Sequence, residues 1–220
     1  MRIVVKTGGA VAVDAAAMVL ELAAEHEVCV VHGAGPQISA EMARYGLRVE
    51  FVDGRRVTSS AALVLVRRSL ARVNAELCDA LGERAVGLIG DVIGLRAQHV
   101  PELGRVGEPL PSRPLAIELA LAQGLVPVVA PLAEGPLNVN ADSAAAALAV
   151  GLEAERILFV SDVPGVLLGG VVAHTLAAGD VDRLLDAGEL EGGIVPKVRA
   201  AMVAARLGVR AEIGATAVVA

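Results

Sequence analysis

Aromatic side chains are scarce in this 220-residue chain, since Tyr45, Phe51 and Phe159 make up only 1% of it. A buried core must therefore be built from Val, Leu, Ile and Ala, the residues typical of buried parallel strands and of the helices that cover them. The scarcity excludes an aromatic platform on which nucleic-acid bases could stack. The net charge of −6 also disfavours a polyphosphate backbone as a partner. We expect no nucleic-acid partner.

Long apolar runs and cysteine pairs are also missing. The longest apolar stretches, such as AAAALAVGL and GLVPVVAPLA, are shorter than the roughly 18 residues that a membrane-spanning helix needs. The first apolar run covers only residues 3–5, which is too short for the core of a signal peptide. Cys29 and Cys78 lie in segments that read as a buried strand and a helix, so we expect reduced thiols. These features predict a cytoplasmic protein with no membrane partner.

Lysine is the third scarce residue: of 19 lysines and arginines, only Lys6 and Lys197 are lysines. Lys6 ends an apolar run and precedes Gly8 and Gly9, and Lys197 follows a second glycine pair in EGGIVPKV. An ammonium is a compact charge with three rotatable donors, and the planar guanidinium fork does not replace it at a tight anion site. The placement indicates that these two lysines have a specific task.

Short β-rich apolar runs alternate with segments of helix length. This pattern predicts an α/β fold in which parallel strands are joined by crossover helices that cover both faces of the sheet. Strands are expected near 2–6, 28–32, 85–89, 126–131, 156–161 and 209–213. Helices are expected near 13–25, 36–46, 59–82, 114–123, 142–151, 180–187 and 195–207. Segments 47–58 and 90–113 are rich in Gly, Pro and charge, which favours hairpins or loops.

Ligands of open α/β sheets bind beyond the carboxyl ends of the strands, so the turns that follow the strands are the candidate sites. One of them contains Gly33 and Gly35, which let backbone N–H groups approach an anion at the start of a helix. Ile38 occupies the third glycine position of a dinucleotide fingerprint, and a P-loop pattern is absent from the sequence. We therefore expect phosphates to be held by the glycine turns, with Lys6 and Lys197 flanking the transferred group. A tight turn without a ligand is the alternative.

The sequence LNVNAD holds two of the chain's three asparagines, Asn138 and Asn140, followed by Asp142. Asp142 fits the N-cap or the first turn of the next helix. One cap needs only one side chain, so a second role, the positioning of the two ammonium groups, explains the cluster better. Arg55 and Arg56 follow a turn, and one of them could bind a small carboxylate bidentately; the alternative is a solvated arginine.

The histidines do not indicate catalysis or metal binding. His32 ends a strand, where a structural role fits better than that of a general base. His26, His99 and His174 have no acidic or cysteine neighbours at the spacing of metal ligands. The residues therefore predict no metal site made of protein side chains.

Taken together, the motifs resemble those of the amino acid kinase family, from residue 3 to about 213. The matching segments are VVKTGGA, VVHGAGPQI, FVDGRRVT, ELGRVGE, VPVVAP, LNVNADSAA, SDVPGV and GGIVPKV, in the family's order and rough spacing. Within the family, GRRVT combined with NVNAD is most similar to the members that phosphorylate N-acetyl-L-glutamate in arginine biosynthesis. The resemblance implies an open αβα sandwich around a mainly parallel sheet, formed by a single domain over residues 1–220.

The resemblance also implies roles for individual residues. Lys6 and Lys197 would stabilise the transferring phosphoryl group, and Asp142 would orient both. Arg56 and Asn138 would bind the substrate. Backbone donors to the phosphates of ATP would come from Gly8, Gly9, Gly33 and Gly35.

Asp162 would lie beside the nucleotide. Magnesium would be held by the phosphates rather than by the protein. The N-terminal half, about 1–130, would bind the acyl amino acid and the C-terminal half, about 131–220, the nucleotide. A homodimer formed through the long helix region is expected from the family.

Two alternatives remain open at this level. One is a kinase for a related carboxylate, such as the carrier-linked aminoadipate of lysine biosynthesis. The other is a shortened, non-catalytic family member that binds nucleotide or amino acid, which the short segment GATAVVA at the end of the chain favours and the two lysines and Asp142 disfavour.

Overall fold

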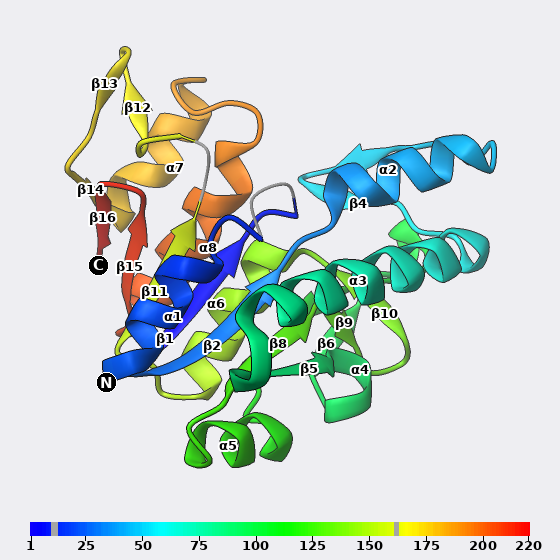
Figure 1. The fold of residues 1–220 in the computed structure, drawn as a ribbon. Helices are drawn as coiled ribbons and strands as arrows, with labels where there is room; N and C mark the ends of the chain where they lie inside the picture. The colour runs from blue at the N-terminus through cyan, green and yellow to red at the C-terminus, as the bar shows by residue number, and fades with distance from the viewer. Residues whose placement is uncertain (10–12, 161–162) are drawn as a thin grey trace.

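The computed structural model describes residues 1–9, 13–160 and 163–220, and it shows an α/β fold built around one large sheet (Figure 1). The eight strands of this sheet run in the order β14-β16-β15-β11-β1-β2-β8-β5. They are β1 (Arg2–Thr7), β2 (Glu27–His32), β5 (Ala85–Ile89), β8 (Val126–Ala130), β11 (Arg156–Val160), β14 (Thr175–Ala177), β15 (Arg210–Ile213) and β16 (Thr216–Val219). All neighbours are parallel except β15 and β16. The predicted open, mainly parallel sandwich is confirmed.

Helices cover both faces of the sheet (Figure 1). They are α1 (Ala16–Glu25), α2 (Gly35–Arg44), α3 (Ser60–Leu81), α4 (Gly90–Ile93), α5 (Leu115–Ala122), α6 (Ala141–Gly151), α7 (Ala178–Asp186) and α8 (Ile194–Arg206). Within the described ranges, no helix has both the length and the apolar character needed to cross a membrane.

The central strands are buried on both sides because successive side chains of a strand point to opposite faces. In β1, Val4 packs into the core that also contains α6 and α8, while Ile3 and Val5 pack into the core under α1 and α3. Each of these three valine and isoleucine side chains is fully buried. This two-sided burial explains why the strands are continuous apolar runs and could be predicted from the sequence.

Smaller sheets surround the large one. A four-stranded sheet has the order β6-β7-β10-β9, and two hairpins pair β3 with β4 and β12 with β13. The bounds are β3 (Phe51–Val52), β4 (Arg55–Arg56), β6 (Ala97–His99), β7 (Val106–Pro109), β9 (Leu132–Ala133), β10 (Leu137–Val139), β12 (Leu167–Leu168) and β13 (Val171–Val172), with short 3-10 helices at Gly82–Arg84 and Pro101–Leu103.

Segment 90–113, expected to form hairpins or loops, contains the antiparallel pair β6 and β7 and also the short helix α4, which the sequence did not predict. Between β8 and α6, β10 pairs in parallel with β7. This pairing fixes the position of Asn138, because β10 carries Asn138 and leads directly into α6.

Candidate active site

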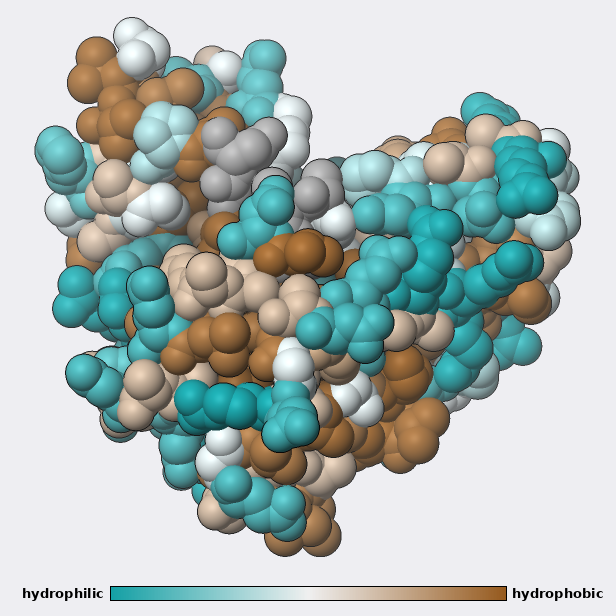
Figure 2. Space-filling model, in the orientation of Figure 1, coloured by the Kyte–Doolittle hydropathy of each residue, from teal (hydrophilic) through white to brown (hydrophobic). Residues whose placement is uncertain are grey.

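A cavity of about 510 Å³ lies at the carboxyl ends of β1 and β2. It is lined by nine of the ten residues to which the family resemblance assigns a role, which are Lys6, Gly8, Gly9, Gly33, Gly35, Arg56, Asn138, Asp142 and Lys197. The tenth, Asp162, lies outside the described residues. In the space-filling view, the molecule is hollowed between the side formed by α7, β12 and β13 and the side formed by α2 (Figure 2).

Lys6 lies near the end of β1 and is only 4% exposed. Its Nζ atom is 2.8 Å from Oδ1 of Asp142, in the first turn of α6. Burial lowers the pKa of the Lys6 ammonium below its ordinary value; the Asp142 carboxylate raises this pKa, and the positive charge of Lys197 lowers it. The two lysines, 191 residues apart in the chain, thus line the same cavity.

Asp142 is free to pair with Lys6 because another residue caps α6. The N-cap is Asn140, whose Oδ1 accepts hydrogen bonds from the backbone N–H groups of Asp142, at 2.8 Å, and Ser143, at 3.1 Å. Of the two positions predicted for Asp142, the structure shows the first turn. Between the described residues Asp142 and Lys197, no ion pair forms within 4.0 Å, so an orienting effect on Lys197 stays a prediction.

The two glycine turns pack directly against each other. The Gly33 N–H donates to the Thr7 carbonyl at 2.9 Å. A Cβ atom on Gly9 would lie 2.7 Å from the Gly33 carbonyl oxygen, which is closer than side-chain atoms can approach backbone. Glycine at position 9 is therefore required by this packing. At Gly35, in contrast, an added Cβ would meet no atom of the described residues within 4 Å, so the backbone faces open space.

Gln37 is a residue of this region that the sequence did not single out. It is the third residue of α2, and its Nε2 donates to the Gly9 carbonyl at 2.9 Å. This bond ties the first glycine turn to the helix that follows the second. A single glutamine beside a glycine motif gives no sequence signal for such a role.

His32 has the structural role that its position at a strand end predicts. It is fully buried, and its Nε2 accepts a hydrogen bond from the Asn74 amide at 3.1 Å, while Nδ1 lies 3.3 Å from the Gly33 carbonyl. The same Asn74 nitrogen donates to the Val128 carbonyl, so the histidine proton is placed on Nδ1. Burial lowers the pKa of His32 to about 4, so the ring is neutral at pH 7.

Arg56 lies in β4 and is only 5% exposed. Its guanidinium donates to the Gly35 carbonyl at 3.0 Å and to Ser39 Oγ at 2.8 Å, contacts Met42 Sδ at 3.5 Å, and stacks over the Phe51 ring at 4.6 Å from its centroid. All of these partners are neutral. Burial lowers the pKa of Arg56 from its ordinary value, as expected for a desolvated cation.

The two neighbouring arginines of GRRVT therefore differ. Arg55 is partly exposed and pairs with Asp53 at 3.8 Å and Glu108 at 3.5 Å. Arg56 has no ion pair with any Asp or Glu of the described ranges. A buried guanidinium without a counter-ion, facing a cavity, is a suitable site for the carboxylate of a ligand.

Asn138 reaches the cavity from β10 and is 9% exposed. Its Nδ2 donates to Thr58 Oγ1 at 3.0 Å, and that hydroxyl donates to the Arg56 carbonyl at 2.7 Å. Asn138 is thus connected to the strand that carries Arg56. Its side-chain oxygen remains as an acceptor for a ligand donor.

The protein side chains provide little for a metal ion. Across residues 1–9, 13–160 and 163–220, no group of three or more His, Cys, Asp or Glu side chains could hold one. Among the described residues that line the cavity, the one carboxylate is Asp142, and it is paired with Lys6. A divalent cation here would need oxygen ligands from a bound phosphate compound.

A family profile, two sequence relatives and one solved structure are similar to this chain over most of its length. The profile of the "Amino acid kinase family" matches residues 1–214. The chain is 41% identical over 198 residues to "Acetylglutamate kinase" of Chloroflexus aurantiacus (strain ATCC 29366 / DSM 635 / J-10-fl), covering 84% of this chain and 78% of the relative. It is 40% identical over 195 residues to "Acetylglutamate kinase" of Jannaschia sp. (strain CCS1), covering 84% and 68%. The crystal structure of smu.665 from Streptococcus mutans UA159 superimposes with a TM-score of 0.91 at 27% identity, covering 99% of this chain and 98% of that one.

Proposed function

The chain belongs to the amino acid kinase family, and from that premise we propose that it phosphorylates the side-chain carboxylate of N-acetyl-L-glutamate. Membership in the family implies that the chain uses ATP and acts on an amino-acid-like substrate. The finer assignment, a step of arginine biosynthesis, is supported by relatives at about 40% identity over most of the chain. The products would be N-acetyl-glutamyl 5-phosphate and ADP.

The observation that carries this proposal is the contrast between the two cations of one cavity. Lys6, paired with Asp142 and joined by Lys197, suits the phosphoryl group that moves. Arg56, buried without a counter-ion, suits a carboxylate that stays bound. N-acetyl-L-glutamate supplies both required anions, since its α-carboxylate can bind Arg56 while its side-chain carboxylate accepts the phosphoryl group.

The reaction needs alignment and charge rather than a base. A side-chain carboxylate has a reference pKa of about 4.3, so it is ionised at neutral pH and attacks without losing a proton. One carboxylate oxygen forms a bond to the γ-phosphorus while the bond from that phosphorus to the β,γ-bridging oxygen breaks, and ADP leaves with the electron pair. This agrees with His32, whose ring is neutral at pH 7 and whose Nε2 already accepts a hydrogen bond from Asn74.

The residues of the cavity divide this task. Lys6 and Lys197 offset the charge of the phosphoryl group in transit, and Asp142 holds Lys6 in place. The backbone N–H groups of the glycine turns donate to the phosphates. When bound, magnesium would offset the negative charge of the phosphates, whose oxygens would be its main ligands. Asp162 is proposed to lie beside the nucleotide.

The assignment as an N-acetyl-L-glutamate kinase also leads us to propose which part of the chain binds each substrate. Residues of about 1–130 would hold the acyl amino acid through Arg56, with Asn138 from the second half as a further ligand, and residues of about 131–220 would hold the nucleotide. We propose a single catalytic domain over 1–220, located in the cytoplasm and paired as a homodimer through α3.

A coupled ADP-release assay tests the proposal. It offers N-acetyl-L-glutamate, glutamate, aspartate, carbamate and carrier-linked aminoadipate in turn, with the Lys197→Ala variant as the control for contaminating kinases. We expect release with N-acetyl-L-glutamate well above the other acids. Release only with carrier-linked aminoadipate would move the assignment to the lysine pathway. Nucleotide binding without release for any acid would support the non-catalytic alternative.

A further inference from the structure

The turn between β3 and β4 lies between the starts of two helices that carry site residues. Asp53 has a φ of 49° and Gly54 a φ of 75°, so both central residues of this two-residue turn are left-handed, as a type I′ hairpin requires. The Gly54 carbonyl accepts a hydrogen bond from Asn140 Nδ2 at 3.1 Å. A Cβ on Gly54 would lie 2.8 Å from Pro196 Cγ. The turn therefore contacts a residue two positions before Asp142 and the residue just before Lys197.

Asn140 uses both ends of its amide. Its Oδ1 caps α6, and its Nδ2 holds the turn. Asp and Ser serve as well as Asn as N-caps, and Thr serves somewhat less well. None of them replaces the amide at the turn, because a carboxylate only accepts hydrogen bonds and a hydroxyl is too short to span both contacts. The cap alone does not explain an asparagine here.

The hairpin held by Asn140 is the element that carries the carboxylate-binding cation. Arg56 lies two residues after Gly54, and its guanidinium stacks on Phe51 of the paired strand. At the other end of the same amide, the Asp142 backbone leads to the carboxylate that holds Lys6. One side chain thus links the hairpin with Arg56 to the helix turn with Asp142.

We propose that Asn140 is a positioning residue that sets the distance between Arg56 and the Lys6–Asp142 pair through the Gly54 carbonyl. This inference rests on the proposed function. The acyl amino acid must span that distance with one carboxylate on Arg56 and the other in line with the γ-phosphorus, and small displacements of this kind slow a reaction strongly.

The amide donor can be removed while the cap is kept. Asn140→Ser is neutral and retains an N-cap, and Asn140→Asp retains the shape of the side chain as well. We expect both variants to raise the KM for N-acetyl-L-glutamate about tenfold, as for one lost hydrogen bond, and to lower kcat several-fold. The KM for ATP should change less than twofold. Ser59→Ala is the matched control, because Ser59 caps α3 through Ala62 alone and its loss should lower Tm without changing either KM.

Hydrogen exchange measured on the same proteins separates this inference from the proposed function. We expect faster deuterium uptake over residues 51–57 in both Asn140 variants and unchanged uptake over 141–151, where the cap remains. If the wild type is active and the variants keep its KM values and its uptake, the positioning role is wrong. A lower Tm with faster uptake over 141–151 alone would reduce Asn140 to a cap. If the wild type phosphorylates none of the acids but residues 51–57 exchange faster in the variants, the proposed function fails while the contact between Asn140 and the hairpin stands.

Discussion

Two buried cations at the same cavity, Lys6 and Arg56, are stabilised in opposite ways. Lys6 is 4% exposed and has the Asp142 carboxylate 2.8 Å away. Arg56 is 5% exposed and is surrounded by a carbonyl, a hydroxyl, a thioether and an aromatic ring. Taking a charge out of water is costly unless an opposite charge compensates it. Within the described residues, the chain supplies that compensation for Lys6 but not for Arg56, and the proposed function assigns it to the substrate carboxylate.

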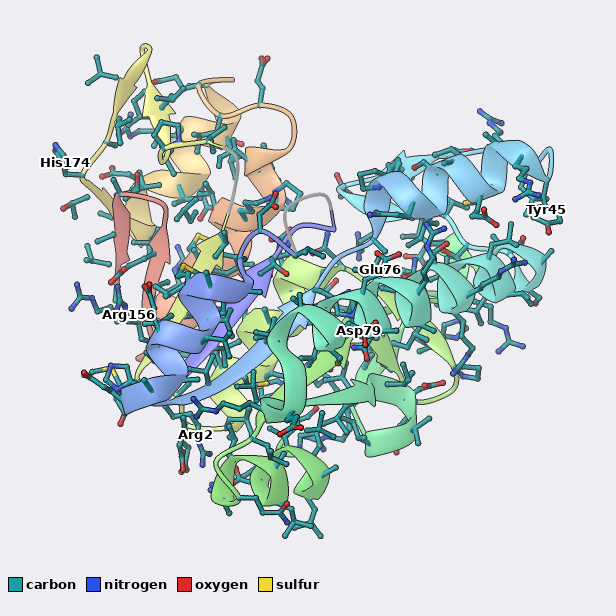
Figure 3. All side chains as sticks on the ribbon, viewed as in Figure 1. Arg2, Tyr45, Glu76, Asp79, Arg156 and His174 are labelled. Carbon is teal, nitrogen blue, oxygen red and sulfur yellow. The ribbon has the colours of Figure 1, made fainter. Side chains whose placement is uncertain are left out.

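Two partly buried arginines outside the cavity, Arg2 and Arg156, are paired with carboxylates, unlike Arg56. Arg2, at the amino end of β1, binds Glu27 at 2.9 Å and Glu118 at 2.7 Å. Arg156, at the amino end of β11, binds Glu212 at 3.0 Å. Both lie away from the cavity (Figure 3). Arg84, Arg96 and Arg105 also donate only to backbone carbonyls, but their side chains are exposed to water. Arg56 differs from them because it is buried.

The largest effect is expected at the lysine end. Lys197→Ala should lower kcat by about three orders of magnitude, since it removes charge stabilisation of the phosphoryl group in transit. The KM for N-acetyl-L-glutamate should change little. Steady-state kinetics with both substrates varied checks this, and circular dichroism checks the fold. A kcat near that of the wild type would remove Lys197 from the proposed mechanism.

The same experiment at Lys6 tests the need for an ammonium. Lys6→Arg keeps the charge but replaces a compact group by a planar fork within a space already shared with Asp142, so we expect kcat to fall at least a hundredfold. Recovery of normal turnover in this variant would show that charge alone is sufficient there.

A smaller effect, and a different one, is expected at the arginine end. Arg56→Ala should raise the KM for N-acetyl-L-glutamate about a hundredfold, as for the loss of a charge-assisted bidentate contact, with the KM for ATP nearly unchanged. Arg55→Ala is the matched control, because Arg55 is already paired with Asp53 and Glu108, and should change the KM less than threefold. An effect of Arg56→Ala confined to ATP would show that the two ends have been exchanged in the assignment.

The smallest effect concerns His32, a buried side chain that stays neutral and therefore needs no counter-ion. Its pKa is about 4 in the folded protein and about 6.5 when unfolded, so its neutral form stabilises the fold fully above pH 6.5. That stabilisation is lost as the pH falls from 6.5 toward 4. At pH 4.5 the free energy of unfolding has fallen by about 2.5 kcal/mol through this group. Urea unfolding of wild type and His32→Gln at pH 7.5 and pH 4.5 measures it. If the free energy of unfolding falls equally in both proteins between pH 7.5 and pH 4.5, His32 is not the group that causes the loss.

The sequence predicted the elements that are buried on both sides and missed the short ones. The apolar run at 126–131 forms β8 at Val126–Ala130, because its side chains fill both cores. By contrast, β9 and β10 have two and three residues, and their pairing with distant β7 gives no local pattern. The closing segment GATAVVA contains the whole of β16, whose antiparallel pairing with β15 is set by the turn at Gly214.

The sequence predicted those site residues whose chemical type suits anion binding and whose position is next to a strand end or a helix start. The two lysines and the glycine pairs could be singled out because each follows or precedes an apolar strand or a helix start. The choice between Arg55 and Arg56 required burial and ion pairing in three dimensions, or a family resemblance. The contacts of Gln37 with Gly9 and of Asn140 with Gly54 join segments that are 28 and 86 residues apart, so local sequence could not show them.

Trapping the product tests the central claim most directly. Acyl phosphates react with hydroxylamine to give hydroxamates, so the protein is incubated with ATP, magnesium, N-acetyl-L-glutamate and hydroxylamine while ADP is measured in parallel. The account predicts one N-acetyl-glutamyl hydroxamate for each ADP released, and neither from the Lys197→Ala variant. ADP release without hydroxamate, or hydroxamate formed from a different acid in preference to N-acetyl-L-glutamate, would contradict it.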